Sequence, residues 1–103
     1  MKNIWLLFLS IFLSLNTYGL YTWLGTVDTD WNNPSNWDAG AVPSATDDVI
    51  LGSSFAYAPE LNTHETCQSI TINYGAELYV FNGSLTVNGS TLIDGSLGID
   101  VGY

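Results

Sequence analysis

The chain has 103 residues, enough for one small domain, and it carries ten Asp and Glu residues against a single basic residue, Lys2. A surface this acidic repels nucleic acids and anionic lipids, which bind through basic groups, and we therefore exclude nucleic acid as a partner. The one cysteine, Cys67, excludes an internal disulfide framework and is expected to be a small buried hydrophobic residue.

Residues 1–19 predict a secretory signal peptide. Lys2 supplies the positive charge, residues 4–15 form an apolar run, and the small residues Thr17 and Gly19 mark the cleavage site. The run is shorter than the about 20 residues that a membrane helix needs. We therefore expect a secreted or cell-surface, extracellular protein, with no membrane contact once the peptide is removed.

Residues 20–44 predict a capping segment rich in Trp, Asn and Asp. A short strand is expected at 20–24, and the density of turn-forming residues after it excludes a regular helix. Trp23, Trp31 and Trp37 carry enough apolar area to hold such a loop against the end of a core.

Trp31 and Trp37 are also the candidate ligand-binding residues, and two interpretations of them stay open. If exposed, the rings form a flat platform that stacks on the sugar rings of a glycan, with Asp and Asn side chains nearby for the hydroxyls. If buried, they cover the first layer of the core, which a repeat fold needs at its end. The second interpretation is favoured.

Four aspartates suggest a possible Ca²⁺ site, because calcium prefers several oxygen ligands: Asp28, Asp30, Asp47 and Asp48. The segment lacks the glycine and the distal glutamate of an EF-hand, so that motif is excluded. Hydrogen bonds from Asp47 and Asp48 to loop amides are the favoured alternative. We therefore predict no metal ligands and no cofactor, with Ca²⁺ as the alternative.

Residues 45–103 are predicted to form the β-rich part of the chain, with strands at 47–52, 67–72 and 78–81. The second strand alternates apolar and polar residues, which places Ile70 and Ile72 on one face. The segment before it is expected to be a loop. This loop contains His64 and Glu65, which we interpret as making local hydrogen bonds, because no nucleophile signature accompanies them.

Residues 82–100 contain a repeat in which a corner recurs every six residues, at Asn82-Gly83, Asn88-Gly89 and Asp94-Gly95. Glycine after Asn or Asp tolerates positive φ, so each corner is expected to turn the chain. The short aliphatic segments between the corners suit strands.

Two all-β architectures fit this repeat. In a short parallel β-helix, or solenoid, the inward positions are Leu85, Val87, Thr91, Ile93, Leu97 and Ile99. In an antiparallel meander or sandwich with two-residue turns, one face holds Leu85, Val87, Ser90, Leu92, Leu97 and Ile99. Each face has five apolar residues in six, so the apolar pattern does not decide. The equal strand lengths favour the β-helix.

The order of motifs resembles the N-terminal segment of large secreted bacterial surface proteins. The residues that carry the resemblance are Trp23-x-Gly25, Asp28-x-Asp30-Trp31, Asn36-Trp37, Pro43, Asp47-Asp48-Val49-Ile50 and Cys67-x-Ser69-Ile70-x-Ile72. Proteins of this kind are repeat-rich, adhesin-like or autotransporter-like β-helix proteins, common in Bacteroidota, and are often exported by the type IX system. The resemblance implies a right-handed parallel β-helix with the Trp-rich segment as its N-terminal cap.

The sequence thus predicts a non-catalytic structural or adhesive segment of an extracellular or cell-surface β-helix protein. The predicted coils look cut in mid-coil, so the partners expected are a continuation of the chain beyond Tyr103, extracellular glycans and other surface proteins. Two alternatives stay open. One is a carbohydrate-binding module with an exposed Trp platform, and the other is the first segment of a β-helix polysaccharide lyase or hydrolase.

Overall fold

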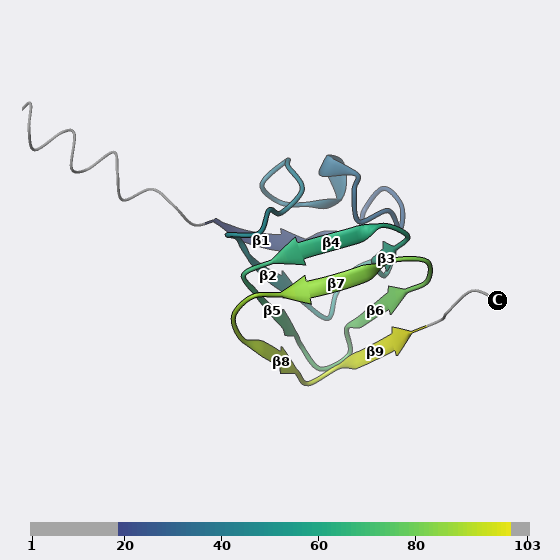
Figure 1. The fold of residues 1–103 in the computed structure, drawn as a ribbon. Helices are drawn as coiled ribbons and strands as arrows, with labels where there is room; N and C mark the ends of the chain where they lie inside the picture. The colour runs from purple at the N-terminus through teal and green to yellow at the C-terminus, as the bar shows by residue number, and fades with distance from the viewer. Residues whose placement is uncertain (1–18, 100–103) are drawn as a thin grey trace, which may run out of the picture.

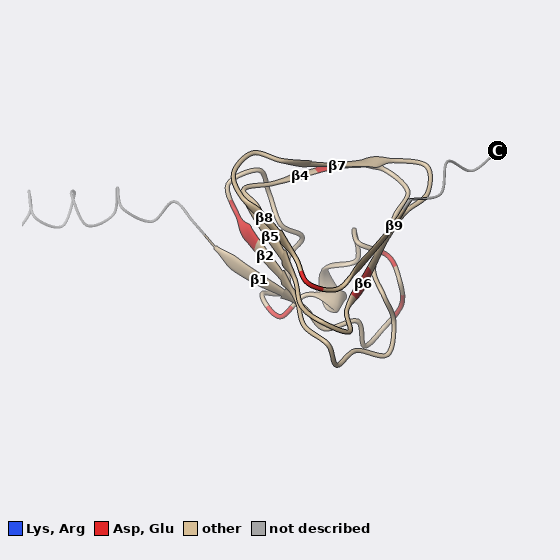
Figure 2. Cartoon of the chain, turned by 90° about the horizontal axis from the view of Figure 1, so that it is seen from below, with Lys and Arg blue, Asp and Glu red and all other residues tan. Residues whose placement is uncertain are grey.

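A computed structural model describes residues 19–99 of the chain. The signal peptide predicted at residues 1–19 lies outside this range except for its last residue. The described residues form an all-β structure of short strands that stack in layers (Figure 1). Seen from below, the strands lie along three sides of a triangle (Figure 2).

Sheet A occupies one side and has four strands. In spatial order they are β1 (Leu20–Trp23), β2 (Asp48–Leu51), β5 (Ser69–Ile72) and β8 (Thr91–Ile93). Sheet B contains β3 (Glu60–Leu61), β6 (Glu77–Val80) and β9 (Ser96–Ile99). Sheet C contains β4 (His64–Cys67) and β7 (Ser84–Val87). A short 3-10 helix, Pro34–Asn36, lies in the loop between β1 and β2.

From β2 onward, the chain visits the sheets in a fixed order, A then B then C. Strands β2, β3 and β4 form one layer, β5, β6 and β7 the next, and β8 and β9 begin a third. Each strand therefore pairs with the strand that occupies the same place in the next layer. His64 pairs with Ser84, for example, 20 residues further along the chain.

All pairs between the named strands in residues 19–99 are parallel. The prediction of parallel strands is confirmed, and the antiparallel meander is wrong. The physical reason is that a strand and its partner are separated by a whole layer of chain. Each corner sends the chain into a different sheet, so a strand meets its partner only after a whole layer and then runs in the same direction.

The core lies inside the triangle, where alternate residues of each strand point inward. Val49, Ile70 and Thr91 are register partners in sheet A, as are Leu51, Ile72 and Ile93. The first two members of each stack are buried. Five of the six inward positions predicted for the repeat face this interior: Leu85, Val87, Thr91, Ile93 and Leu97. The side chain of Ile99 lies outside the described residues.

The corner glycines are needed for a reason other than the predicted one. Gly83, Gly89 and Gly95 do not have positive φ angles. Instead, each lies against the corner of the preceding layer. A Cβ atom on Gly83 would be 2.0 Å from the carbonyl oxygen of Thr63, and one on Gly89 would be 2.7 Å from that of Gln68. Glycine at these corners therefore allows successive layers to approach.

The segment at 53–66 was expected to be a loop, but it contains β3 and β4. Neither strand has a strong apolar pattern of its own, and both form because a strand of the next layer offers a hydrogen-bonding edge. The strand predicted at 67–72 also divides, since Gln68 is a corner between β4 and β5.

Candidate functional site

Three tryptophans close the end of the core above β1. The ring centroid of Trp37 is 5.1 Å from that of Trp23 and 4.8 Å from that of Trp31, and both contacts are edge-to-face. The indole nitrogen of Trp37 donates a hydrogen bond of 2.8 Å to the carbonyl oxygen of Trp31. Trp23 makes the same kind of bond to Tyr57. Aromatic burial and directional bonds together hold the loop onto the core.

The glycan platform proposed for Trp31 and Trp37 is wrong. The two side chains are only 1% and 2% exposed, so neither presents a ring face on which a sugar could stack. The rings lie inward because they cover apolar residues of the first layer that would otherwise face water. Both residues thus have the covering role that the sequence favoured.

Asn36 organises the polar side of the same loop. It is fully buried, and its amide oxygen accepts hydrogen bonds of 3.2 Å from the backbone nitrogens of Val27 and Asp28. Its amide nitrogen donates to Oδ1 of Asp28 at 2.6 Å and to the carbonyl oxygen of Asp30 at 3.0 Å. The bond from Asn36 and one from the backbone of Asp30 lower the pKa of Asp28 below its ordinary value of 3.8.

Of the four aspartates considered for calcium, Asp28 and Asp30 belong to the network around Asn36, whereas Asp47 and Asp48 make their bonds elsewhere. Asp47 accepts from the backbone nitrogens of Gly19 and Ser44 at 3.0 and 2.7 Å, as expected for a residue that binds loop amides. Asp48 accepts from the hydroxyl of Ser69. Within residues 19–99, no group of three or more His, Cys, Asp or Glu side chains has the spacing of a metal site. The absence of a metal and of a cofactor stays a prediction, with Ca²⁺ as its alternative.

His64 and Cys67 lie on β4. His64 is on a strand rather than in the expected loop, and its Nδ1 lies 2.8 Å from the hydroxyl of Ser84 in the next layer. Cys67 is completely buried, as predicted. Burial, with the negative charge of Asp48, raises the pKa of its thiol to about 11, which suppresses the reactive thiolate.

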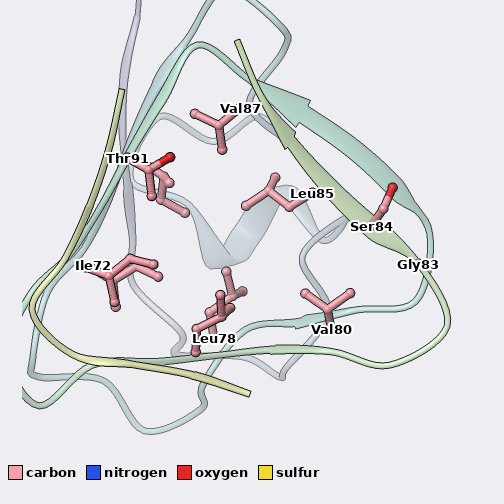
Figure 3. A pocket seen from close by; sticks show the side chains of 11 residues that line it. Ile72, Leu78, Val80, Gly83, Ser84, Leu85, Val87 and Thr91 are labelled. Atoms are coloured by element: carbon pink, nitrogen blue, oxygen red, sulfur yellow. The ribbon is translucent and has the colours of Figure 1, made fainter. Parts of the chain in front are cut away.

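The end of the core opposite the tryptophans is not closed by the described residues. An apolar cavity of about 400 Å³ lies there, lined by the inward side chains of β5 to β9 (Figure 3). Two of these side chains, Ile93 and Leu97, are 45% and 43% exposed. The third layer has strands in sheets A and B, and β7 has a strand on one side only among residues 19–99. The open end therefore exposes apolar side chains of the core to solvent.

Two other residues of functional interest, Tyr79 and Phe81, were not predicted from the sequence. They lie on the outer face of sheet B with their rings nearly parallel. The strand at 78–81 was predicted without assigning its two faces, and this did not separate the buried Leu78 and Val80 from the aromatic residues between and after them. Strict alternation along the strand is the signal that would have found them.

Within residues 19–99, no helix is long and apolar enough to cross a membrane. A family model described as a domain of unknown function (DUF8693) matches residues 22–100. No match was found among curated proteins or among solved structures.

Proposed function

We propose, for a chain that belongs to the DUF8693 family of domains of unknown function, a non-catalytic structural role at the start of an extracellular β-helix. The three parallel sheets are read as the first coils of this β-helix, and the Trp-rich loop is read as its cap. The proposal includes export by the signal peptide and a place in a secreted or cell-surface, adhesin-like protein.

The observation that carries the proposal is the difference between the two ends of the core. At one end, the buried Trp31 and Trp37 cover the apolar interior. At the other, the cavity lies open and the strands of sheets A and B have an unpaired edge among the described residues. A fold that is closed at one end and open at the other suits the beginning of a stack, because repeat folds bury each layer against the next.

We infer that the open end is covered by a further coil of parallel strands, supplied by chain that follows Tyr103. The register of the strands supports a further coil as the structure that covers the open end. Strands β2, β5 and β8 of sheet A already align their inward side chains, so a further strand beside β8 in the same register would extend each apolar stack by one residue. The carboxylates of Asp28 and Asp47 accept hydrogen bonds that hold the capping loop, and this structural role supports a non-catalytic function.

The open end can be tested with the 103-residue chain after removal of its signal peptide. We expect this protein to bind the dye ANS or to self-associate, because Ile93 and Leu97 are exposed. The double variant Ile93→Glu/Leu97→Glu should lose most of that signal. The double variant Leu24→Glu/Val27→Glu makes the same chemical change to exposed residues of the capped end and should keep it.

A protein that is monomeric and binds no ANS, while melting cooperatively, would contradict the open end.

The proposed location at the cell surface has its own test, in which intact cells that express the tagged protein are treated with an added protease. We expect the tag to be degraded while a cytoplasmic marker survives. A tag that is protected until the cells are lysed would contradict surface exposure.

A further inference from the structure

The outer face of sheet B carries two aromatic rings that no role described above uses. Tyr79 and Phe81 are two positions apart, and the residues beside them, Leu78 and Val80, point into the core. The ring centroids are 6.1 Å apart and the ring planes differ by only 7°. This distance is within the roughly 4.5–7 Å range of interacting aromatic pairs, and the two rings are stacked.

The position of Tyr79 is fixed by the strand beside it. Its register partner in β9 is Gly98, and a Cβ atom on that glycine would lie 2.7 Å from Cδ1 and 3.0 Å from Cε1 of the ring. The tyrosine ring therefore occupies the space above the glycine where a side chain would stand. The edge of the ring that carries Cδ1 and Cε1 is therefore turned toward Gly98, and the residue is half-buried.

Shielding a glycine is a known structural role for an aromatic neighbour on a sheet. That role explains Tyr79 but not Phe81, which lies beyond the end of β6 and is also half-buried. Two parallel rings on one outward face, both partly accessible to solvent, have the form of a small aromatic platform. We call Tyr79 and Phe81 the sheet B platform.

Carboxylates lie beside the platform on two strands. Glu60 in β3 is the register partner of Tyr79 on the side opposite Gly98. Glu77 in β6 is two residues before Tyr79 and accepts a hydrogen bond from its hydroxyl. A carboxylate has about four acceptor positions, so Glu77 can accept further hydrogen bonds while it holds the tyrosine.

We propose that the sheet B platform binds a neutral glycan, with sugar rings stacked on Tyr79 and Phe81 and hydroxyl groups donating to Glu60 and Glu77. Aromatic faces and nearby acceptors match the two surfaces of a pyranose, its C–H face and its hydroxyl edge. The charge selects among glycans. The sequence has one Lys or Arg, Lys2, against ten Asp and Glu residues, so polysaccharides that carry uronate or sulfate groups are repelled.

This inference gives the adhesive part of the proposed function a ligand class, and it rests on the chain being exported. The two fail separately, since the dye-binding and protease tests above do not depend on Tyr79 or Phe81. A chain that passes those tests and binds no glycan would lose only the present inference.

The test is native gel electrophoresis of the signal-peptide-free chain through gels that contain one soluble polysaccharide each. The neutral probes are xyloglucan, mixed-linkage β-glucan, glucomannan and amylopectin, and the acidic probes are polygalacturonate and alginate. We expect at least one neutral probe to retard the protein and neither acidic probe to do so. Tyr79→Ala and Phe81→Ala should each weaken the binding about fivefold or more.

Two further variants separate stacking from folding. Tyr79→Phe keeps the ring over Gly98 and should retain most of the binding. Tyr74→Ala removes a tyrosine that is 81% exposed at a corner and should leave the binding unchanged. Thermal melting of each variant shows whether it is folded. Failure of all four neutral probes, stronger retardation by an acidic probe, or undiminished binding by a folded Phe81→Ala variant would overturn the proposal.

Discussion

The corner glycines show how a single residue sets the spacing between layers. Gly83 lies against Thr63, and Gly95 would place a Cβ atom 2.5 Å from the carbonyl oxygens of Asn73 and Ala76. These neighbours are backbone atoms, which cannot move away as the end of a flexible side chain can. The Asn-Gly pairs identified the corners correctly. The reason for glycine was missed because the contact involves residues about 20 positions away in the sequence.

Gly83→Ala is predicted to destabilise the protein by about 1–3 kcal/mol, because the added methyl group overlaps the backbone of Thr63. The measurement is the free energy of unfolding in urea. Gly52→Ala is the matched control, since a Cβ atom there meets nothing within 4 Å and the φ angle is not left-handed. It should change stability by no more than about 0.5 kcal/mol. Equal losses for both variants would refute the layer contact.

Two of the capping tryptophans allow a comparison of hydrogen bonding at similar burial. The indole nitrogen of Trp37 donates to the carbonyl oxygen of Trp31, whereas that of Trp31 has no partner among the described residues. Trp37→Phe should therefore cost about 1–2 kcal/mol more than Trp31→Phe, as measured by urea unfolding. The two substitutions remove the same volume, so a reversed order would mean that the bond does not matter for stability.

The loop between β1 and β2 is the element in which polar groups replace regular secondary structure. Buried Asn36 supplies four hydrogen bonds, and Asp28 accepts from the side chains of Asn33 and Asn36 at 3.1 and 2.6 Å. The composition of this segment predicted an ordered loop held by tryptophans. The particular network was not predictable, since many Asn and Asp residues occur together and only tertiary contacts choose which one is buried.

This loop is expected to weaken in acid. The hydrogen bonds that favour its carboxylate lower the pKa of Asp28 in the folded protein below the ordinary value of 3.8. The stabilisation is therefore fully present above that pH, and it is lost as the pH falls through the lower, folded value. Between pH 6 and pH 2, the melting temperature should fall less for Asp28→Asn than for the unchanged chain.

Asp94→Asn serves as the control for this comparison, because it removes one carboxylate from an exposed corner and changes the net charge equally. The melting temperature of Asp94→Asn should fall between pH 6 and pH 2 by as much as that of the unchanged chain. If Asp28→Asn and Asp94→Asn behaved alike, the acid sensitivity would come from net charge and not from the bonds of the loop.

For the whole molecule, the direction of the strands could be predicted from the sequence, whereas some of the individual strands could not. The equal lengths of the segments between the corners favoured parallel strands, and the inward positions given for the β-helix follow from that choice. Strands β3 and β4 were not, because they have little apolar character and depend on edges offered by β6 and β7. The open cavity could not be predicted either, because side chains from five strands line it.

Strands in successive layers run in the same direction, and disulfide formation across sheet C can measure this direction. In a Cys67→Ala background, the pairs His64→Cys/Ser84→Cys and Thr66→Cys/Thr86→Cys join register partners. The crossed pair His64→Cys/Thr86→Cys joins residues about 8 Å apart if the strands are parallel, which is too far for a disulfide. We predict that mild oxidation links both direct pairs and leaves the crossed pair reduced. Efficient linkage of the crossed pair, with the direct pairs unlinked, would show antiparallel strands and contradict the account.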